Sequence, residues 1–433
     1  MKFGRSLGFL AALVSALCIG GLLSVAVTSK SYSESYPAVV CPPTLAGLTS
    51  QISLASKKTP FQRLQNRTTK TAPVKVLRLP VNKDSLLFSS DGVTPVVWQS
   101  RASSWAGGAV CTGPETSQWF VGGTADITTR GRLIIINSGL SDAVVDVQSF
   151  TENGKQPLRT ITVVSKNYQV IPTDSLAPGD KYLTVHVAPR SGRINAFVID
   201  EQGTGLKSLG GDLINSVSNA SKPVMIPAIP NQIKNNSALP HTLRVLTPGD
   251  VDASVTAEVL SSDGVFVPVG LTSRTVSAGI VTEFQFTPKI SSTVLAVRIT
   301  STEPVVAAIK STVTVAGRKD FVWSTSAPEL VPLTIAITGL TPLISFVGER
   351  INVSLDVTLT NGKVVRKTVK GTDIATWRAP DAARSFTITK VGPDTFAGAL
   401  VSSVNGYGYF PIASGSLLTK IELPDSNIRV LNP

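Results

Sequence analysis

Side chains that carry enzyme chemistry are scarce in this sequence. Its 433 residues include two histidines and three cysteines, and 16% of the residues are charged. His186 lies in an alternating apolar run and His241 follows Pro240, and neither has a histidine, cysteine or glutamate nearby at the spacing of metal ligands. The G-x-S-x-G, H-E-x-x-H and Walker motifs do not occur. We therefore expect a protein that is not an enzyme and that holds no metal or other cofactor.

Three weaker patterns leave this expectation in place. Residues 203–208 lack the last glycine of a dinucleotide-binding loop. Asp250 and Asp252 supply too few oxygens for a calcium ion, so a turn-stabilising role is favoured for them. Asp200 and Glu201 are neighbours in the chain, and neighbouring strand residues point to opposite faces. They would therefore need a bulge or a third acid to serve as the carboxylate pair of a glycosidase.

Long apolar runs are missing except at the start of the chain. Residues 7–27 hold 21 residues without a charge, and as a helix they would extend for about 30 Å, enough to cross a hydrocarbon core. Lys2 and Arg5 precede this run, so we expect the N-terminus to stay in the cytoplasm and the chain after Lys30 to lie outside.

The alternative interpretation of residues 7–27 is a cleaved secretory signal. Ser24-Val25-Ala26 fits a cleavage site of small residues, but the apolar run is longer than the roughly 7–15 residues of a typical signal. The length favours an uncleaved anchor. Both interpretations place residues 31–433 outside the cytoplasm, and the first one predicts a single-pass protein of the cell membrane.

Methionine and tyrosine are rare as well, with two and six residues, whereas glycine and proline are frequent, with 34 and 28. Apolar positions are rich in valine and isoleucine, which favour strands, and no helical periodicity follows the anchor. The composition predicts an all-β protein whose turns use glycine and proline.

Two cysteines remain outside the anchor, because Cys18 lies within it. Cys41 and Cys111 would face an oxidising compartment, where a disulfide between them would close a loop worth roughly 4 kcal/mol in the chain-entropy model. The alternative is two free buried thiols. We predict the disulfide, because it is the one pairing possible outside the membrane.

Acidic residues are absent between Ser35 and Lys83, although the whole chain has a net charge of +12. We interpret residues 31–83 as a basic stalk that contacts anionic lipid or an anionic wall polymer; the alternative is a solvated stalk with no partner. Phe61 is the one aromatic residue near these charges, so nucleic acid is not expected as a partner. The eight basic residues of this segment are Lys57, Lys58, Arg63, Arg67, Lys70, Lys75, Arg78 and Lys83.

Tryptophan and glycine are concentrated in the segment that follows the basic one. Trp98, Trp105 and Trp119 lie within 22 residues, and exposed indole faces there could stack on sugar rings. The alternative is that they fill a β-sheet core, as aromatic residues in small domains usually do.

The chain repeats itself from about residue 116. Residues 132–139 align with residues 242–249 at an offset of 110, and a fainter third copy around residues 353–362 follows at an offset of 98. Hairpin dipeptides recur in register as Asn153-Gly154, Asp263-Gly264 and Asn361-Gly362. Short alternating strands in units of about 100 residues predict tandem immunoglobulin-like β-sandwiches.

These features define five predicted segments. They are the cytoplasmic tip and anchor (1–30), the basic stalk (31–83), the tryptophan-rich segment with the first sandwich (84–222), the second sandwich (223–330) and the third sandwich (331–433).

The order of these features resembles a known family. An anchor, Cys41-Pro-Pro, the tryptophan-rich segment and Asn-Ser-Gly or Thr-Pro-Gly turns near valine-rich strands are similar to an actinobacterial envelope family, domain-of-unknown-function family 5719. The chain departs from the commoner Asn-Pro-Gly turn, and the third copy has no such turn. The resemblance implies a membrane-anchored extracytoplasmic protein and offers no catalytic residues.

The sequence therefore favours a non-enzymatic envelope scaffold or accessory protein that contacts wall polymer or other envelope proteins. A carbohydrate-binding module built on the tryptophans is a second hypothesis. An envelope hydrolase, whose site is assembled from distant parts of the chain, is a third.

Overall fold

The computed structural model describes residues 37–66, 68–73, 78–89, 92–234 and 237–416. Strands dominate this part of the chain, and one short 3-10 helix, η1 (Thr173–Ser175), accompanies them. The all-β prediction is confirmed. The predicted anchor, residues 7–27, lies outside the described residues. Within the described part, no helix is long and apolar enough to cross a membrane.

The strands form four consecutive units that we call units I to IV. Unit I spans residues 37–111 and has two sheets, with strand orders β1-β6-β3-β4 and β5-β2-β8-β9. Its strands are β1 (Pro37–Cys41), β2 (Thr49–Ser53), β3 (Pro60–Arg63), β4 (Lys70–Thr71), β5 (Arg78–Val81), β6 (Leu86–Ser89), β7 (Val93–Thr94), β8 (Val96–Arg101) and β9 (Trp105–Val110).

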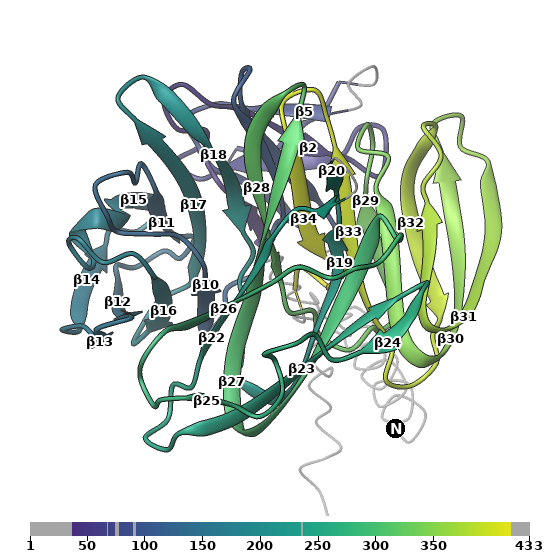
Figure 1. Ribbon diagram of the computed structural model, residues 1–433. Helices are drawn as coiled ribbons and strands as arrows, with labels where there is room; N and C mark the ends of the chain where they lie inside the picture. The colour runs from purple at the N-terminus through teal and green to yellow at the C-terminus, as the bar shows by residue number, and fades with distance from the viewer. Residues whose placement is uncertain (1–36, 67, 74–77, 90–91, 235–236, 417–433) are drawn as a thin grey trace, which may run out of the picture. The chain divides into compact units, whose positions relative to one another are not determined.

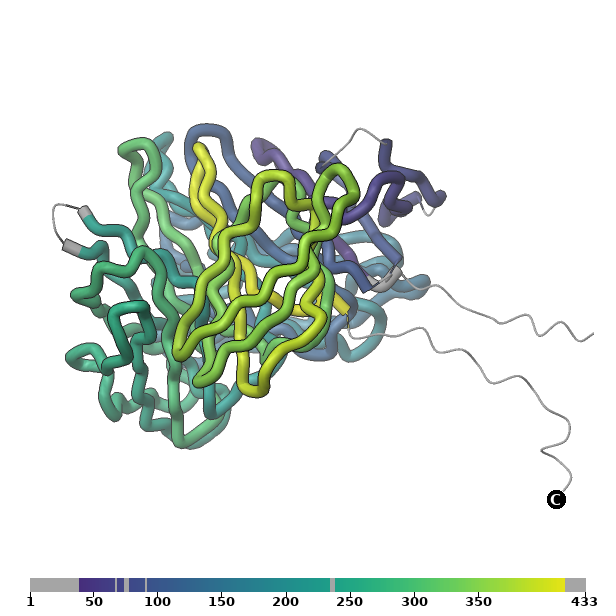
Figure 2. Tube along the Cα trace, turned by 90° about the vertical axis from the view of Figure 1, so that its right-hand side faces the viewer, coloured from purple at the N-terminus to yellow at the C-terminus, as the bar shows by residue number. Residues whose placement is uncertain are grey.

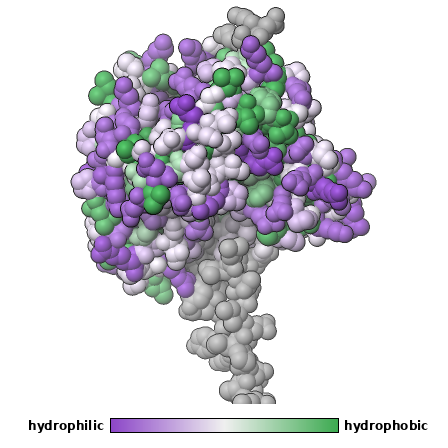
Figure 3. All heavy atoms as spheres, turned by 60° about the horizontal axis from the view of Figure 1, so that its bottom comes forward, coloured by the Kyte–Doolittle hydropathy of each residue, from purple (hydrophilic) through white to green (hydrophobic). Residues whose placement is uncertain are grey.

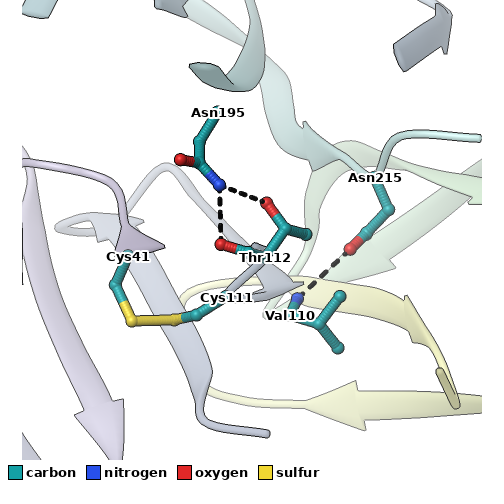
Figure 4. Close-up of a disulfide and its surroundings, with 6 residues drawn as sticks. All are labelled: Cys41, Val110, Cys111, Thr112, Asn195 and Asn215. Atoms are coloured by element: carbon teal, nitrogen blue, oxygen red, sulfur yellow. Dashed lines mark hydrogen bonds between the residues drawn. A yellow bond between two sulfur atoms is a disulfide. The ribbon is translucent and has the colours of Figure 1, made fainter. Parts of the chain in front are cut away.

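Unit I corrects the prediction of a stalk. The basic segment up to Lys83 contributes β1 to β5, and the tryptophan-rich segment completes the same two sheets with β6, β8 and β9. A disulfide joins Cys41, at the end of β1, to Cys111, just after β9 (Figure 4). Buried apolar residues between the lysines, such as Ile52, Leu64 and Leu79, form the core that a stalk would lack.

Unit II spans residues 112–220 and repeats the strand orders of unit I as β10-β16-β12-β13 and β15-β11-β17-β18, with β14 added beside β12. Its strands are β10 (Gln118–Val121), β11 (Arg132–Asn137), β12 (Ala143–Thr151), β13 (Gly154–Lys155), β14 (Arg159–Val163), β15 (Asn167–Pro172), β16 (Thr184–Pro189), β17 (Ile194–Thr204) and β18 (Lys207–Ile214).

Unit III spans residues 221–330 and makes the same pairings, with one difference in connection. Its strand β27 is continuous over 22 residues and replaces both β16 and β17, pairing with β23 and β19 first and with β22 and β28 later. Its strands are β19 (Ser221–Pro230), β20 (Ile233–Lys234), β21 (Ser237–Ala238), β22 (His241–Leu246), β23 (Ala253–Ser261), β24 (Gly264–Phe266), β25 (Arg274–Val276), β26 (Thr282–Phe286), β27 (Val294–Val315) and β28 (Arg318–Thr325).

Unit IV spans residues 331–416 and joins two further pairs of strands. Its β30 takes the places of β11 and β12, and β31 takes those of β14 and β15, so that the two form one long ribbon facing the viewer in Figure 2. The turn missing from the third sequence copy is thus replaced by continuous strand. The strands are β29 (Leu333–Ala336), β30 (Leu343–Leu359), β31 (Val364–Arg378), β32 (Ala383–Lys390), β33 (Phe396–Ser402) and β34 (Tyr407–Pro411).

The aligned sequence copies occupy matching places in these units. Leu133 in β11 and Leu243 in β22 are fully buried, and each pairs with the long strand of its own unit. Val145, Val255 and Val353 are buried in β12, β23 and β30. The alternation read from the sequence therefore identifies the core-facing side of β12, β23 and β30.

The last strands of the four units pack against one another in cyclic order. Strand β9 contacts β18, β18 contacts β28, β28 contacts β34, and β34 contacts β9 again, near the middle of the view in Figure 1. Glycine permits this close packing: a Cβ on Gly408 would lie 2.6 Å from the backbone nitrogen of Gly108, and one on Gly211 would lie 2.8 Å from the ring of Trp105. The contact between units I and IV is extended by a parallel pairing of β7 with β29.

Candidate functional site

The clearest candidate site is the basic surface of unit I. Lys57 and Lys58 lie in the loop between β2 and β3, Lys70 lies in β4, and Lys83 follows β5. All four side chains are exposed. Among the described residues, no ion pair joins any of them to an acid. Their charges are therefore available to an anionic partner.

Arg63 and Lys83 also line a cavity of about 810 Å³ beside β2 and β5. Its walls include Leu45, Leu48 and Pro80, and Asp84 contributes a carboxyl group. Burial raises the pKa of the Asp84 carboxyl, against the opposing effects of backbone hydrogen bonds and of Arg63. The cavity combines apolar walls with two cations, so it suits a ligand that carries both an apolar part and a negative charge.

The other basic residues of the segment divide into two groups. Arg67 and Lys75 lie outside the described residues. Arg78 faces unit IV, where its side chain lies against Gly339. Its Nε and Nη2 atoms are buried and have no hydrogen-bond partner in the structure, and burial lowers the pKa of its guanidinium group. Arg78 therefore belongs to the contact between units I and IV rather than to the exposed basic surface.

The structure removes the three tryptophans from the list of sugar-stacking residues. Trp105 is fully buried, and Trp98 and Trp119 are each 8% exposed. Trp119 is stacked on His186 with ring centroids 4.0 Å apart, and it also contacts Phe150. The aromatic rings fill the cores and the contacts between units, which corrects the sugar-binding prediction for these residues: no ring face is left for a sugar.

The adjacent acids Asp200 and Glu201 point to opposite sides of β17, as the alternation of a strand requires. Asp200 accepts a hydrogen bond from the indole nitrogen of Trp323 at 2.8 Å. Glu201 accepts two hydrogen bonds from Arg101, at 2.5 and 2.8 Å. Each carboxylate is occupied by a different partner, so the pair is not arranged for glycoside cleavage.

Each of the two histidines has a ring nitrogen within hydrogen-bond distance of a serine hydroxyl. Ser117 lies 3.0 Å from Nε2 of His186. Ser311 lies 2.9 Å from Nδ1 of His241, and burial lowers the pKa of His241 to about 4. Within the described residues, no group of three or more histidine, cysteine, aspartate or glutamate side chains is arranged to hold a metal ion.

The structure also shows where the possible calcium-binding acids and the glycine-containing segment 203–208 lie. The Asp252 carboxylate accepts a hydrogen bond from the backbone N–H of Ala278 at 2.8 Å, which holds the turn before β23. Residues 203–208 form the hairpin between β17 and β18, so this glycine-containing segment does not open a helix.

Sequence reasoning missed a group of buried acids where the last strands meet. Asp212 in β18 accepts hydrogen bonds from the backbone N–H groups of Leu213 and Trp323, and burial raises its pKa well above the ordinary value. Asp320 in β28 accepts from the N–H groups of Gly211 and Phe321, and burial raises its pKa to about 7. Neither acid lines the cavity beside β2 and β5, so both are assigned to the contact between units.

A family match can now be placed on this architecture. The sequence pattern described as "Family of unknown function (DUF5719)" matches residues 99–373. The chain belongs to this family. The matched region of the family begins in β8 and ends in β31, so it covers units II and III completely and leaves out most of unit I. The basic surface of unit I therefore lies outside the part of the chain that the family pattern describes.

Other comparisons add little to the family. No curated protein matches the chain. Among solved structures, a crystal structure of Thermotoga maritima 1070 matches with 14% identity and a TM-score of 0.19, covering 25% of this chain and 93% of that one. A similarity of this size carries no argument about fold or function.

Proposed function

We propose that this protein is a non-enzymatic scaffold or accessory protein of a bacterial cell envelope, anchored by residues 7–27 and binding an anionic envelope polymer through unit I. The proposal includes an actinobacterial source, an extracytoplasmic location and immunoglobulin-like units. Other envelope proteins are further partners, and nucleic acid is not one. The observation that carries the proposal is the unpaired, exposed basic surface of unit I.

The excess of basic over acidic residues distinguishes unit I from the rest of the protein. Between residues 37 and 111 the chain has nine basic and two acidic residues. Polarity alone does not distinguish this unit, because hydrophilic side chains also cover much of the face that Figure 3 shows. A net positive surface attracts phosphate or carboxylate groups within about one Debye length, roughly 8 Å at physiological salt.

Chain length adds a second argument. Residues 28–36 separate the expected anchor from β1, and nine residues span at most about 30 Å when fully extended. An anchor in residues 7–27 would therefore hold the basic surface of unit I close to the membrane surface.

The test uses the full-length chain in nanodiscs of neutral lipid, so that the anchor is already occupied. Binding to a soluble polyphosphate chain is measured at about 50 mM and about 500 mM salt. We expect binding at low salt that is lost at high salt. Replacing Lys57, Lys58, Lys70 and Lys83 with serine should weaken low-salt binding by roughly tenfold or more, because phosphate contacts depend steeply on the number of cations.

A matched control removes the same charge elsewhere. Lys363, Lys367, Lys370 and Lys390 are exposed residues of unit IV, and replacing them with serine should leave more of the binding intact. Equal losses in the two variants would show that net charge, rather than unit I, attracts the polymer. Binding that persists at high salt would contradict the electrostatic proposal.

A further inference from the structure

Four equivalent hairpins meet at one end of the cyclic arrangement of last strands. Each hairpin joins the last two strands of its unit: β8–β9, β17–β18, β27–β28 and β33–β34. Hydrogen bonds link their tips. The N–H of Ser103 donates to Asn405, Ser104 contacts Ser208 at 2.5 Å, and Arg318 donates to the carbonyl of Val404 at 3.1 Å. Figure 1 shows these hairpins along the top of the view. We call this surface the hairpin face.

The loop before β11 extends the hairpin face. The N–H of Gly203 donates to the carbonyl of Thr128 at 2.8 Å, and the guanidinium group of Arg130 donates to the carbonyl of Gly205. These contacts place Ile127 beside the β17–β18 hairpin. Loops from distant parts of the chain therefore form one continuous surface.

Large apolar side chains project from this surface into solvent. Leu206 is 105% exposed, Ile127 is 100% exposed and Val404 is 83% exposed. Because these side chains are almost fully exposed, they contribute nothing to the core of any unit. Polar residues are usually found at such tips, so three large apolar residues on one face indicate a contact with an apolar partner.

Basic side chains surround the apolar tips. Lys207 follows Leu206 in the β17–β18 hairpin. The loop before β11 contains Arg130, and the β27–β28 hairpin contains Arg318 and Lys319. Three acids face this region, and each has partners: Glu201 is paired with Arg101, Asp126 accepts hydrogen bonds from Thr128, and Asp320 is buried beneath the hairpins. The hairpin face is thus apolar at its tips and positively charged around them.

We propose that the hairpin face docks on an anionic lipid bilayer, with Leu206, Ile127 and Val404 entering the boundary between headgroups and acyl chains. Separate projecting side chains fit a fluid bilayer better than the flat or hollow surface of a folded partner. Lysine and arginine beside them reach phosphate groups while their own aliphatic parts stay apolar. This contact uses different residues from the polymer binding proposed for unit I, and it adds the burial of apolar side chains to the attraction between charges.

The position of the chain ends leaves this face accessible. Strand β9 runs from Trp105 at the hairpin end to Val110, and Cys111 follows it at the opposite end. Gly415 contacts Cys111 and Val39 there, so the beginning and the end of the described chain both lie away from the hairpins. The hairpin face is therefore turned away from the membrane that would hold residues 7–27, and the bilayer that it contacts is a second one.

The first experiment reports insertion at a single residue. The full-length chain, with Cys18→Ser to remove the remaining free thiol, is placed in nanodiscs of neutral lipid, and Leu206→Cys is labelled with an environment-sensitive fluorophore. Adding vesicles of phosphatidylglycerol and phosphatidylcholine should raise the emission about twofold and shift it to the blue, because the label leaves water. The same label at Leu140→Cys, in the β11–β12 turn at the other end of unit II, should not respond.

The second experiment measures partition onto the same vesicles by co-sedimentation. The triple variant with serine at Ile127, Leu206 and Val404 should bind roughly tenfold or more weakly. The control variant should bind like the unchanged protein. It has serine at three other exposed apolar residues, Leu140, Val251 and Val269, which are 78%, 61% and 101% exposed. Since all six residues are exposed, both variants should keep the unfolding midpoint of the parent, which is measured alongside.

The outcomes separate this inference from the proposed function. Serine at the four lysines of unit I should weaken polyphosphate binding by roughly tenfold or more and leave the response of the label at residue 206 in place. Equal partition of the two triple variants, or a label at residue 206 that stays in water while vesicles bind, would overturn the inference. Failure to bind anionic vesicles at all would also overturn it and would point to a protein partner for the hairpin face.

Discussion

Units I and II have the same order of strands and very different charges. Unit I has nine basic and two acidic residues, whereas unit II, residues 112–220, has nine basic and ten acidic ones. In unit II some charges are paired, as in the contact of Arg190 with Asp146 at 2.7 Å. In unit I the lysines on the surface have no acidic partner among the described residues.

This difference shows that the fold does not depend on the charges. What the two units share is the alternation of buried residues along short strands, for example Leu79 and Val81 in β5, and Val145 and Val147 in β12. Burial of apolar area supplies the main stabilising force, and surface charge adds little to it. Surface charge can therefore vary between units and serve binding.

The largest loss of stability is expected from removing the disulfide, which unit I has and unit II lacks. Replacing Cys41 and Cys111 with serine should lower the free energy of unfolding of unit I by roughly 4 kcal/mol, because the bond closes a long loop in the unfolded chain. Hydrogen exchange resolved along the chain should show faster exchange in β1 to β6 than in β11 to β17. Equal acceleration in both units would mean that unit I unfolds only together with its neighbours.

The second largest loss of stability is expected from disturbing the contact between β9 of unit I and β34 of unit IV. Gly408→Ala places a Cβ 2.6 Å from the Gly108 nitrogen, and we expect a loss of stability of about 1–3 kcal/mol from this overpacking. Gly249→Ala is the control, since nothing lies within 4 Å of its Cβ position. Thermal unfolding of the two variants measures the difference, and similar midpoints would show that β34 and β9 can separate without cost.

Buried acids should make the contact between units II and III sensitive to pH. The folded pKa of Asp320 is about 7 and its ordinary value is 3.8, so the folded state retains a proton that the unfolded state has released. The stability associated with this group is complete below about pH 4 and is lost as the pH rises through about 7. His241 acts in the opposite direction, because its pKa falls from 6.5 to about 4, and its contribution is lost as the pH falls through about 4.

The variant Asp320→Asn isolates the first of these two groups. Asparagine keeps an oxygen that can accept from Gly211 and Phe321 and cannot become charged. We expect the variant to be more stable than the parent by about 1–3 kcal/mol at pH near 8 and to differ little from it at pH near 5. Chemical unfolding at both pH values measures this, and a variant that is less stable at the higher pH would contradict the assignment of a buried, protonated carboxyl.

The smallest change in stability is expected from removing the surface charges themselves. Serine at Lys57, Lys58, Lys70 and Lys83 should change the free energy of unfolding by less than about 0.5 kcal/mol, because these side chains are exposed. Arg190→Ser in unit II should cost a similarly small amount, since exposed ion pairs are weak. A large loss of stability in the lysine variant would show that these residues have a structural role, and would weaken the comparison between the two units.

The candidate site could be predicted in part. The unbalanced charge before Lys83 identified the segment that carries the basic surface, but the segment was expected to be a stalk. Its strands are short, from two to six residues, and lysines interrupt the alternation of apolar residues, so no repeat with unit II is visible. The spacing of Cys41 and Cys111 around these strands was the signal that could have revealed a closed unit.

The amino-acid sequence by itself determined the class of the fold and the core-facing side of strands such as β12 and β23, in which buried and more exposed residues alternate. Alternation, hairpin dipeptides and valine-rich runs act over a few residues, so they can be read without knowing the rest of the chain. Tertiary structure alone decided that the units close into a cycle, that Trp105 is covered by Gly211 and that the Leu206 and Val404 hairpins share one face. The contacts between the hairpins join residues from 86 to 302 positions apart, and they depend on how whole sheets pack, which no local pattern encodes.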